Sequence, residues 1–114
     1  MTLREVRDTF LKITENCYHY EAWEEAESYI VWAEDGQADA TYSDDKMQTQ
    51  VVEGTLDLYT KTEYDPLFEK CQATMNDCES MTWRLNSIQH EEETDYIHYE
   101  WVWQITQRVG DVDG

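Results

Sequence analysis

Basic residues are scarce in this sequence. Its 114 residues include 26 aspartates and glutamates but only 8 lysines and arginines, so the formal net charge is -18 at pH 7. Proteins that bind nucleic acid use lysine and arginine to displace the counterions of the phosphates, and anionic membrane surfaces attract the same side chains. The composition therefore argues against ordinary nucleic-acid binding and against membrane-surface binding. A field this negative repels DNA or attracts a basic partner.

Long apolar runs are missing as well. None approaches the roughly 18 residues of a membrane span, and the opening segment, MTLREVRDTF, contains no signal-peptide hydrophobic region. The 3 cysteines, Cys17, Cys71 and Cys78, form an odd set without the spacing of a disulfide framework. We therefore expect free thiols in a reducing cytosol and no membrane association.

Motifs that carry catalysis are also absent. The sequence has no glycine-rich phosphate loop and no G-x-S-x-G nucleophile motif. Its 3 histidines are His19, His90 and His98, and their spacing relative to Cys17 matches no zinc-site template. We expect no enzymatic activity, no cofactor and no metal site.

The sequence does contain apolar residues in regular patterns. Hydrophobic content of 40% and aromatic content of 13% are too high for a disordered acidic chain, so we expect a folded domain. A capping box of Thr2 and Glu5, followed by apolar residues at helical spacing, predicts a helix over 2–14. Asp65-Pro66 opens a second helix that runs to about residue 79, because aspartate is a favoured N-cap and proline fits the first helical position.

The remaining apolar segments predict strands. Their ranges are 16–20, 28–34, 46–62, 81–92 and 94–106. They are separated by an acidic connection over 21–27, a turn at Asp35-Gly36, a polar loop over 37–45 and an acidic EEETD hairpin turn. This order predicts an α+β fold, with a mainly antiparallel β-sheet and two α-helices packed on one face. We expect one domain over 1–106 and a flexible C-terminal tail over 107–114.

The segment YIHYEWVWQI, residues 96–105, is unusually rich in aromatic rings. Side chains alternate between the two faces of a strand. One face then carries Ile97, Tyr99, Trp101, Trp103 and Ile105, and the other carries Tyr96, His98, Glu100, Val102 and Gln104. The first face is apolar enough to form the core beneath the helices. Alternatively, some of these rings complete a core only when a second subunit arrives, since aromatic residues are enriched in interface cores.

Acidic residues gather in two blocks. No lysine or arginine occurs between Lys12 and Lys46, or between Arg84 and Arg108. Such runs are commonly just a solvated surface. The alternative is a negative wall to which DNA does not adhere, and a ring of subunits would concentrate that field into a channel.

Three segments carry a family resemblance: MTLREVRDTFLKIT, YIVWAEDGQADATYSDDKMQTQVVEGTLDLYTKTEYDP and WRLNSIQHEEETDYIHYEWVWQI. The most specific parts are VEGTLDLYTKTEYDP, where a strand runs into an Asp-Pro-capped helix, and the acidic hairpin of RLNSIQHEEETDYIHYEWVW. In these segments, which span residue 1 to about 106, the chain resembles the tail completion, or tail terminator, family of siphophages and prophages. The segment EAWEEAESYI departs from the family pattern by its high acidity.

The resemblance implies a virion structural protein located at the head-proximal end of the tail and assembled in the host cytoplasm. Such proteins form a homo-oligomeric ring, usually a hexamer, that caps the tail tube, contacts the tail-tube protein and docks the head-tail connector. DNA passes through the ring without specific binding. The resemblance carries no catalytic residues over to this chain.

The sequence offers candidate residues for two surfaces of such a ring, the contact between subunits and the central channel. The aromatic pool for the oligomer interface is Trp32, Tyr59, Trp83, Tyr99, Trp101 and Trp103, some of which belong to the core. The candidates for an acidic channel are Glu34, Asp35, Asp39, Asp44 and Asp45, with Glu91, Glu92 and Glu93 as a second patch.

Two other functions compete with the ring. An acidic protein of this size could mimic DNA and inhibit a basic host nuclease or restriction factor, which would need regularly spaced carboxylates on one face. An enzyme is the third possibility, and we discount it because no nucleophile and base occur at a specific spacing.

Overall fold

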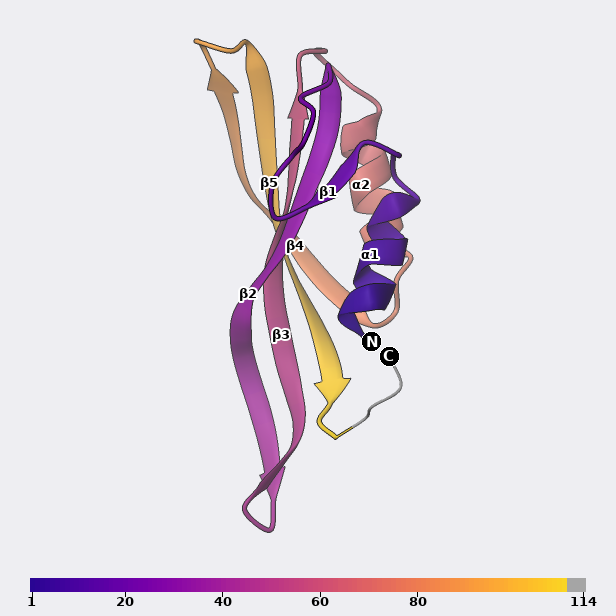
Figure 1. The fold of residues 1–114 in the computed structure, drawn as a ribbon, viewed down its shortest axis with the longest axis vertical. Coiled ribbons are helices and arrows are strands. Elements are labelled where there is room, and N and C mark those ends of the chain that lie inside the picture. Colours follow the sequence, from indigo (N-terminus) through magenta and orange to yellow (C-terminus); the bar gives the residue numbers. More distant parts are fainter. Residues whose placement is uncertain (111–114) are drawn as a thin grey trace.

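The structure, a computed structural model, describes residues 1–110 of the chain. Its elements are α1 (Leu3–Leu11), β1 (Cys17–His19), β2 (Ser28–Ser43), β3 (Lys46–Thr60), α2 (Leu67–Asn76), β4 (Met81–Glu91) and β5 (Tyr96–Arg108). The strands form one sheet in the order β1-β2-β3-β5-β4, in which β1 is parallel to β2 and every other pair is antiparallel. Both helices cover the same face of that sheet (Figure 1). The predicted α+β class is confirmed.

Each helix begins where the sequence predicts. The Thr2 hydroxyl accepts a hydrogen bond from the Glu5 amide and the Glu5 carboxylate accepts one from the Thr2 amide, which completes the capping box of α1. At the start of α2, Pro66 already has helical φ and ψ of -59° and -17°. The Asp65 carboxylate accepts a hydrogen bond from the Leu67 amide at 2.9 Å, so Asp65 satisfies one of the otherwise unpaired donors of the first turn.

Asp65 also ties α2 to the sheet. Its second carboxylate oxygen accepts hydrogen bonds of 2.7 Å from the hydroxyls of Ser28 and Thr60, at the start of β2 and the end of β3. Asp65 and Thr60 are buried. Burial disfavours ionisation of Asp65, but the hydrogen bonds from Leu67, Ser28 and Thr60 outweigh it and lower the pKa of the carboxyl.

The core lies between the helices and the middle of the sheet. Trp101, Trp103 and Ile105 of β5 are buried there, which confirms the predicted inward face of this strand. Phe10 of α1 packs edge-on against Trp32 and Trp103, with ring centroids 5.9 and 6.1 Å apart. Each such buried ring removes a large apolar area from water, which stabilises the fold.

Gly54 allows β3 to pass beneath Trp103. A Cβ atom at this position would lie 2.3 Å from the Trp103 ring and 2.2 Å from the Ala33 carbonyl oxygen. The register of β2 shifts at the same level, between Glu34 and Gly36. The irregularity is therefore in β2, the partner strand opposite Gly54, and has the two-against-one pairing of a β-bulge.

Two sequence predictions about β2 are wrong. No turn occurs at Asp35-Gly36, and residues 37–43 of the predicted loop belong to the strand. β2 instead continues through three register shifts, and the chain reverses at Asp44 and Asp45, whose φ angles of 52° and 63° suit a two-residue hairpin turn. Backbone hydrogen bonds with β3 hold residues 36–43 of β2 in place. This segment therefore forms a strand without the alternation of apolar and polar residues that a buried face would require.

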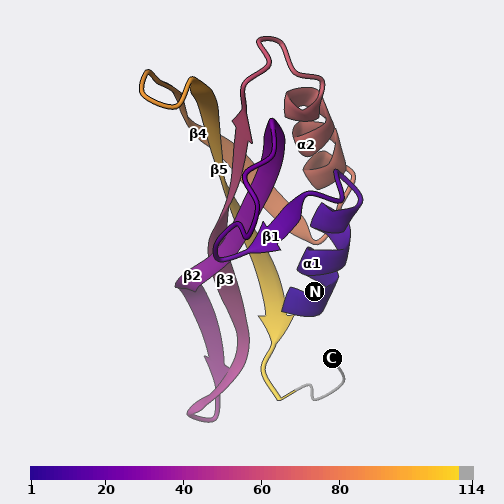
Figure 2. The same ribbon diagram turned by 45° about the horizontal axis from the view of Figure 1, so that its top comes forward.

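The β2–β3 hairpin projects beyond the helices, as Figures 1 and 2 show, and the described chain extends 53 Å along its longest axis. β5 also continues past the predicted boundary at 106, because Gln107 and Arg108 pair with Gln50 and Thr49. The rest of the predicted tail from 111 onward lies outside the described residues. Within residues 1–110, neither helix has both the length and the apolar character that crossing a membrane requires.

Candidate functional site

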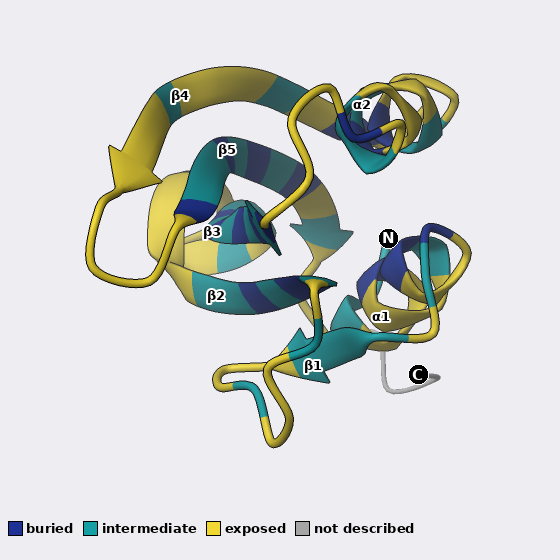
Figure 3. Ribbon diagram, turned by 90° about the horizontal axis from the view of Figure 1, so that it is seen from above, coloured by how far each residue is buried: buried dark blue, intermediate teal, exposed yellow. Residues whose placement is uncertain are grey.

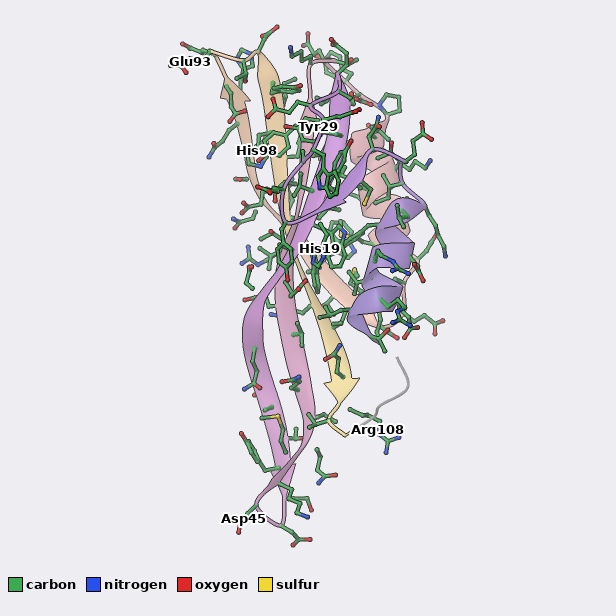
Figure 4. The ribbon with its side chains drawn as sticks, viewed as in Figure 1. His19, Tyr29, Asp45, Glu93, His98 and Arg108 are labelled. Atoms are coloured by element: carbon green, nitrogen blue, oxygen red, sulfur yellow. The ribbon has the colours of Figure 1, made fainter. Side chains whose placement is uncertain are left out.

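The acidic candidates form two separate patches. Asp35 and Asp39 lie along β2, and Asp44 and Asp45 form the tip of its hairpin. Glu91, Glu92 and Glu93 lie at the turn between β4 and β5, at the opposite end of the molecule, as the positions of Asp45 and Glu93 in Figure 4 show. Asp44–Asp45 and Glu91–Glu93 therefore form separate acidic patches at the two ends of one subunit.

Glu34 differs from the other acidic candidates, because it belongs to a packed cluster. Its carboxylate accepts a hydrogen bond from the Tyr20 hydroxyl and pairs with His19 Nε2 at 2.8 Å. The His19 ring stacks between Trp32 and Tyr20, with centroid distances of 3.9 and 3.8 Å. Partial burial works against ionisation of Glu34, but these hydrogen bonds lower its pKa. This arrangement indicates a structural role for Glu34.

Asp35, the next residue, has the opposite electrostatic environment. Burial raises the pKa of its carboxyl, and the nearby charges of Glu53, Asp57 and Glu34 raise it further. The middle of the sheet therefore carries more negative charge than its own residues neutralise.

The aromatic pool divides by burial. Trp32, Trp101 and Trp103 are buried within the monomer, whereas Tyr59, Trp83 and Tyr99 are partly exposed. Only the second group offers ring surface to another molecule. Tyr99 packs beside Phe68 of α2 at 4.7 Å between centroids, so its free surface is small.

The structure exposes large rings that the sequence analysis did not select. Trp23 and Tyr64 are each 87% exposed, and Tyr42 on the hairpin is exposed as well. Trp23 lies in the connection between β1 and β2, and Tyr64 precedes α2. Their acidic and polar neighbours, in EAWEEAE and KTEYD, were the available signal that these rings lie outside strands.

A row of rings crosses the outer face of the sheet, which is the face away from the helices. Tyr29, Tyr59 and His98 are neighbours on β2, β3 and β5, and Tyr59 stacks on both others with centroid distances of 5.1 and 4.3 Å. Tyr96 packs edge-on against Tyr29 and Tyr59, and its hydroxyl donates to the Ala26 carbonyl. The connection over 21–27 is thereby held against this face.

A polar cluster lies beside this row. His98 Nε2 and Asp57 Oδ1 are 2.6 Å apart, and both side chains are 16% exposed. The hydrogen bond to Asp57 raises the pKa of His98 although burial acts against it, and the charges of Asp57, Glu91 and Glu100 also raise it. The Glu100 carboxylate accepts a 2.7 Å hydrogen bond from Asn86.

The β4 edge, defined as Met81–His90, is exposed at most of its positions (Figure 3). β4 pairs only with β5, so its outer backbone groups have no strand partner in the described chain. The segment MTWRLNSIQH contains no aspartate or glutamate, although the whole sequence has 26. Ile88 is 56% exposed on this strand. An acid-free, partly apolar edge is therefore available on a strongly acidic protein.

The sheet has a second free edge of opposite character. β1 covers β2 only opposite Ile30, Val31 and Trp32, so β2 is uncovered on that side over 36–43, a segment we name the hairpin edge. The hairpin edge and its turn carry Asp39, Asp44 and Asp45. The two edges thus differ in both charge and shape.

Comparison of the chain with known protein families and with curated proteins finds no match.

Proposed function

We propose that this chain is a virion structural subunit, a phage tail terminator that assembles into a ring, caps the tail tube and joins it to the head connector. The single observation that carries the proposal is the contrast between the acid-free β4 edge and the acidic hairpin edge of one sheet. The resemblance of the sequence to tail completion proteins supplies the biological setting.

The β4 edge has the properties of a strand-pairing surface. Free edges of soluble proteins are normally protected by charged residues, proline or a covering segment, because unpaired backbone groups recruit other strands. The β4 edge has one charged residue, Arg84, and no proline. Its exposed Leu85 and Ile88 would add apolar contact to backbone hydrogen bonds with a partner.

The two edges favour association of unlike surfaces. Contacts between different patches of identical subunits generate rings when the rotation closes. Arg84 on one edge and Asp39 on the other are of opposite charge, so electrostatics favours pairing β4 of one subunit with the hairpin of the next. Hairpins gathered in this way would place Asp44 and Asp45 of every subunit close together, where they repel the phosphates of passing DNA.

The DNA-mimic alternative has less support. A mimic needs regularly spaced carboxylates on one face, whereas the two predicted acidic patches, at Asp44–Asp45 and at Glu91–Glu93, lie at opposite ends of the molecule. Its acid-free β4 edge would also have no role in binding a basic target. We therefore retain the mimic only as an outcome of the experiment.

Light scattering coupled to size exclusion, at low and high salt and with or without tail-tube protein, tests the ring. We expect a species near six times 13.6 kDa, or a complex that caps tubes, and we expect assembly to improve with salt because screening relieves repulsion between acidic subunits. A chain that stays monomeric at high salt and ignores tubes would contradict the proposal. Binding to basic host proteins that weakens with salt would then favour the mimic.

Matched variants locate the interface. Ile88→Asp places a charge on the β4 edge, and Leu11→Asp places the same charge on α1 at a residue that is 45% exposed. We expect Ile88→Asp to weaken assembly at least about tenfold, which corresponds to about 1.4 kcal/mol, and Leu11→Asp to leave assembly unchanged. Equal effects of the two variants would exclude the β4 edge as the contact.

A further inference from the structure

The sheet brings Asp57 of β3 beside two potential metal ligands of β5, His98 and Glu100. Three histidines pair with carboxylates: His19 with Glu34, His90 with Asp95, and His98 with Asp57. Within residues 1–110, only the pair of His98 and Asp57 has a third ligand beside it, Glu100, and the donor atoms of the three residues lie within 4.8 Å of one another.

The register of β3 and β5 explains why these residues meet. Asp57 is directly opposite Glu100, and Tyr59 is directly opposite His98. All four side chains share the outer face of the sheet, since they have the same parity along their strands. His98 is labelled in Figure 4 on the side away from the helices. Because β3 and β5 are interior strands of the sheet, the backbone positions of the three ligands are fixed.

Neighbouring side chains fix the orientation of two of the ligands. The Tyr59 ring stacks on His98 with an interplanar angle of 16°. Asn86 donates to Glu100 Oε1 and accepts a 2.8 Å hydrogen bond from Arg84. Asn86 reaches Glu100 because the register of β4 shifts between Leu85 and Ser87. Metal ligands in proteins are commonly held by such outer contacts.

The negative charges of Asp57 and Glu100 favour the binding of a cation at this position. Like charges directly opposite each other destabilise an antiparallel pair. The corresponding problem does not arise between Glu53 and Gln104, because the neutral Gln104 amide donates to the Glu53 carboxylate at 2.9 Å. Asp57 and Glu100 are both acidic, and the basic group that contacts Asp57 is His98. A divalent ion would neutralise both carboxylates.

We propose that Asp57, His98 and Glu100 form a binding site for a divalent transition-metal ion of the Zn²⁺ class. One imidazole nitrogen and two carboxylate oxygens suit Zn²⁺ or Mn²⁺ better than Mg²⁺ or Ca²⁺, which prefer all-oxygen sites. Three protein ligands leave a fourth position of a tetrahedral ion for water. Bound there, the ion would link β3 to β5. The site does not depend on ring formation.

Zn²⁺ titration into metal-free protein tests the site, with excess Mg²⁺ present to occupy non-specific carboxylates. Imidazole nitrogen signals followed by NMR report which histidine binds. We expect His98 to shift stoichiometrically while His19 and His90, each beside one carboxylate, stay unchanged. Shifts at all three histidines, or none at His98, would overturn the proposal even if no variant could be made.

Calorimetry on variants then assigns the ligands. We expect His98→Gln and Glu100→Gln each to weaken Zn²⁺ binding by about 100-fold, and Asn86→Ala by about tenfold, as loss of an outer contact does. His90→Gln is the matched control and should bind like the original chain. Circular dichroism verifies that each variant is folded. Unchanged affinity in a folded Glu100→Gln variant would reduce the site to a simple His98–Asp57 pair and contradict the proposal.

Discussion

The helix-covered half of the sheet and the projecting half of the β2–β3 hairpin are held by different forces. Under the helices, Trp101, Trp103 and Phe10 are fully buried, Phe10 packs against Trp103, and Trp101 packs against Phe68 of α2. In the projecting half, residues 36–43 are mostly exposed, and backbone pairing with β3 is the main contact. The first half supplies stability, and the second supplies surface that other molecules can reach.

The largest difference in unfolding free energy is expected between two variants, each of which truncates an aromatic side chain in one of the two halves. We expect Trp103→Ala to lower the free energy of unfolding by about 3–5 kcal/mol, because it leaves a cavity in the core. Tyr42→Ala on the exposed hairpin should change it by less than about 0.5 kcal/mol. Urea unfolding followed by tryptophan fluorescence and circular dichroism measures both. Similar losses from the two variants would show that the hairpin shares the core's stability.

A medium effect is expected at the junction of the helix-covered half with α2. Asp65→Ala removes the acceptor for Leu67, Ser28 and Thr60 and should cost about 1–3 kcal/mol at pH 7. The pKa of Asp65 is lowered in the folded state, so its ionic contribution is present above the unfolded pKa of about 3.9 and is lost as pH falls through the folded pKa.

Asp65→Asn removes the charge of this side chain but keeps its shape. Asparagine still caps the helix but does not titrate, so the variant should lose less stability as the solution is acidified than the original chain does. Unfolding free energies at neutral and acidic pH give the difference for each protein. An identical pH dependence in the two proteins would show that Asp65 does not contribute through its charge.

The smallest effect is expected at the hairpin turn. Replacing Asp44 by Asn and Asp45 by Gly supplies the residues that a two-residue turn with positive φ prefers. Global stability should rise by no more than about 0.5 kcal/mol. Amide hydrogen exchange should slow locally over 36–51 and remain unchanged under the helices. Slower exchange in both halves would mean that the hairpin and the core open together.

The same contrast explains which features were predictable from the sequence. The alternation of Trp101, Trp103 and Ile105 with Val102 and Gln104 predicted the inward face of β5, because a half-buried strand needs that pattern. Residues 37–43 have no buried face, so their polar side chains suggested a loop although the backbone pairs. Hydrophobic patterning detects burial, and it detects a strand only where burial accompanies pairing.

The candidate metal site and the candidate interaction surfaces were harder to predict from the sequence. Asp57, His98 and Glu100 match no linear metal motif, because the register of β3 with β5 brings them together. The acidic and polar neighbours of Trp23 and Tyr64 indicated positions outside the strands, but only the structure shows that both rings are exposed. The acid-free stretch of β4 was visible in the sequence, but its meaning depends on β4 being the edge strand.

The order of strands has a consequence for synthesis on the ribosome. β5 follows β4 in the sequence but lies between β3 and β4 in the sheet. Until β5 has emerged, β3 presents an unpaired edge, and β4 has no neighbour to pair with. A nascent chain that stops before Tyr96 would therefore expose two open edges to other nascent chains, which is a route to aggregation. Completion of β5 pairs β3 with β4 through β5, so the described sheet keeps the β4 edge and the hairpin edge free.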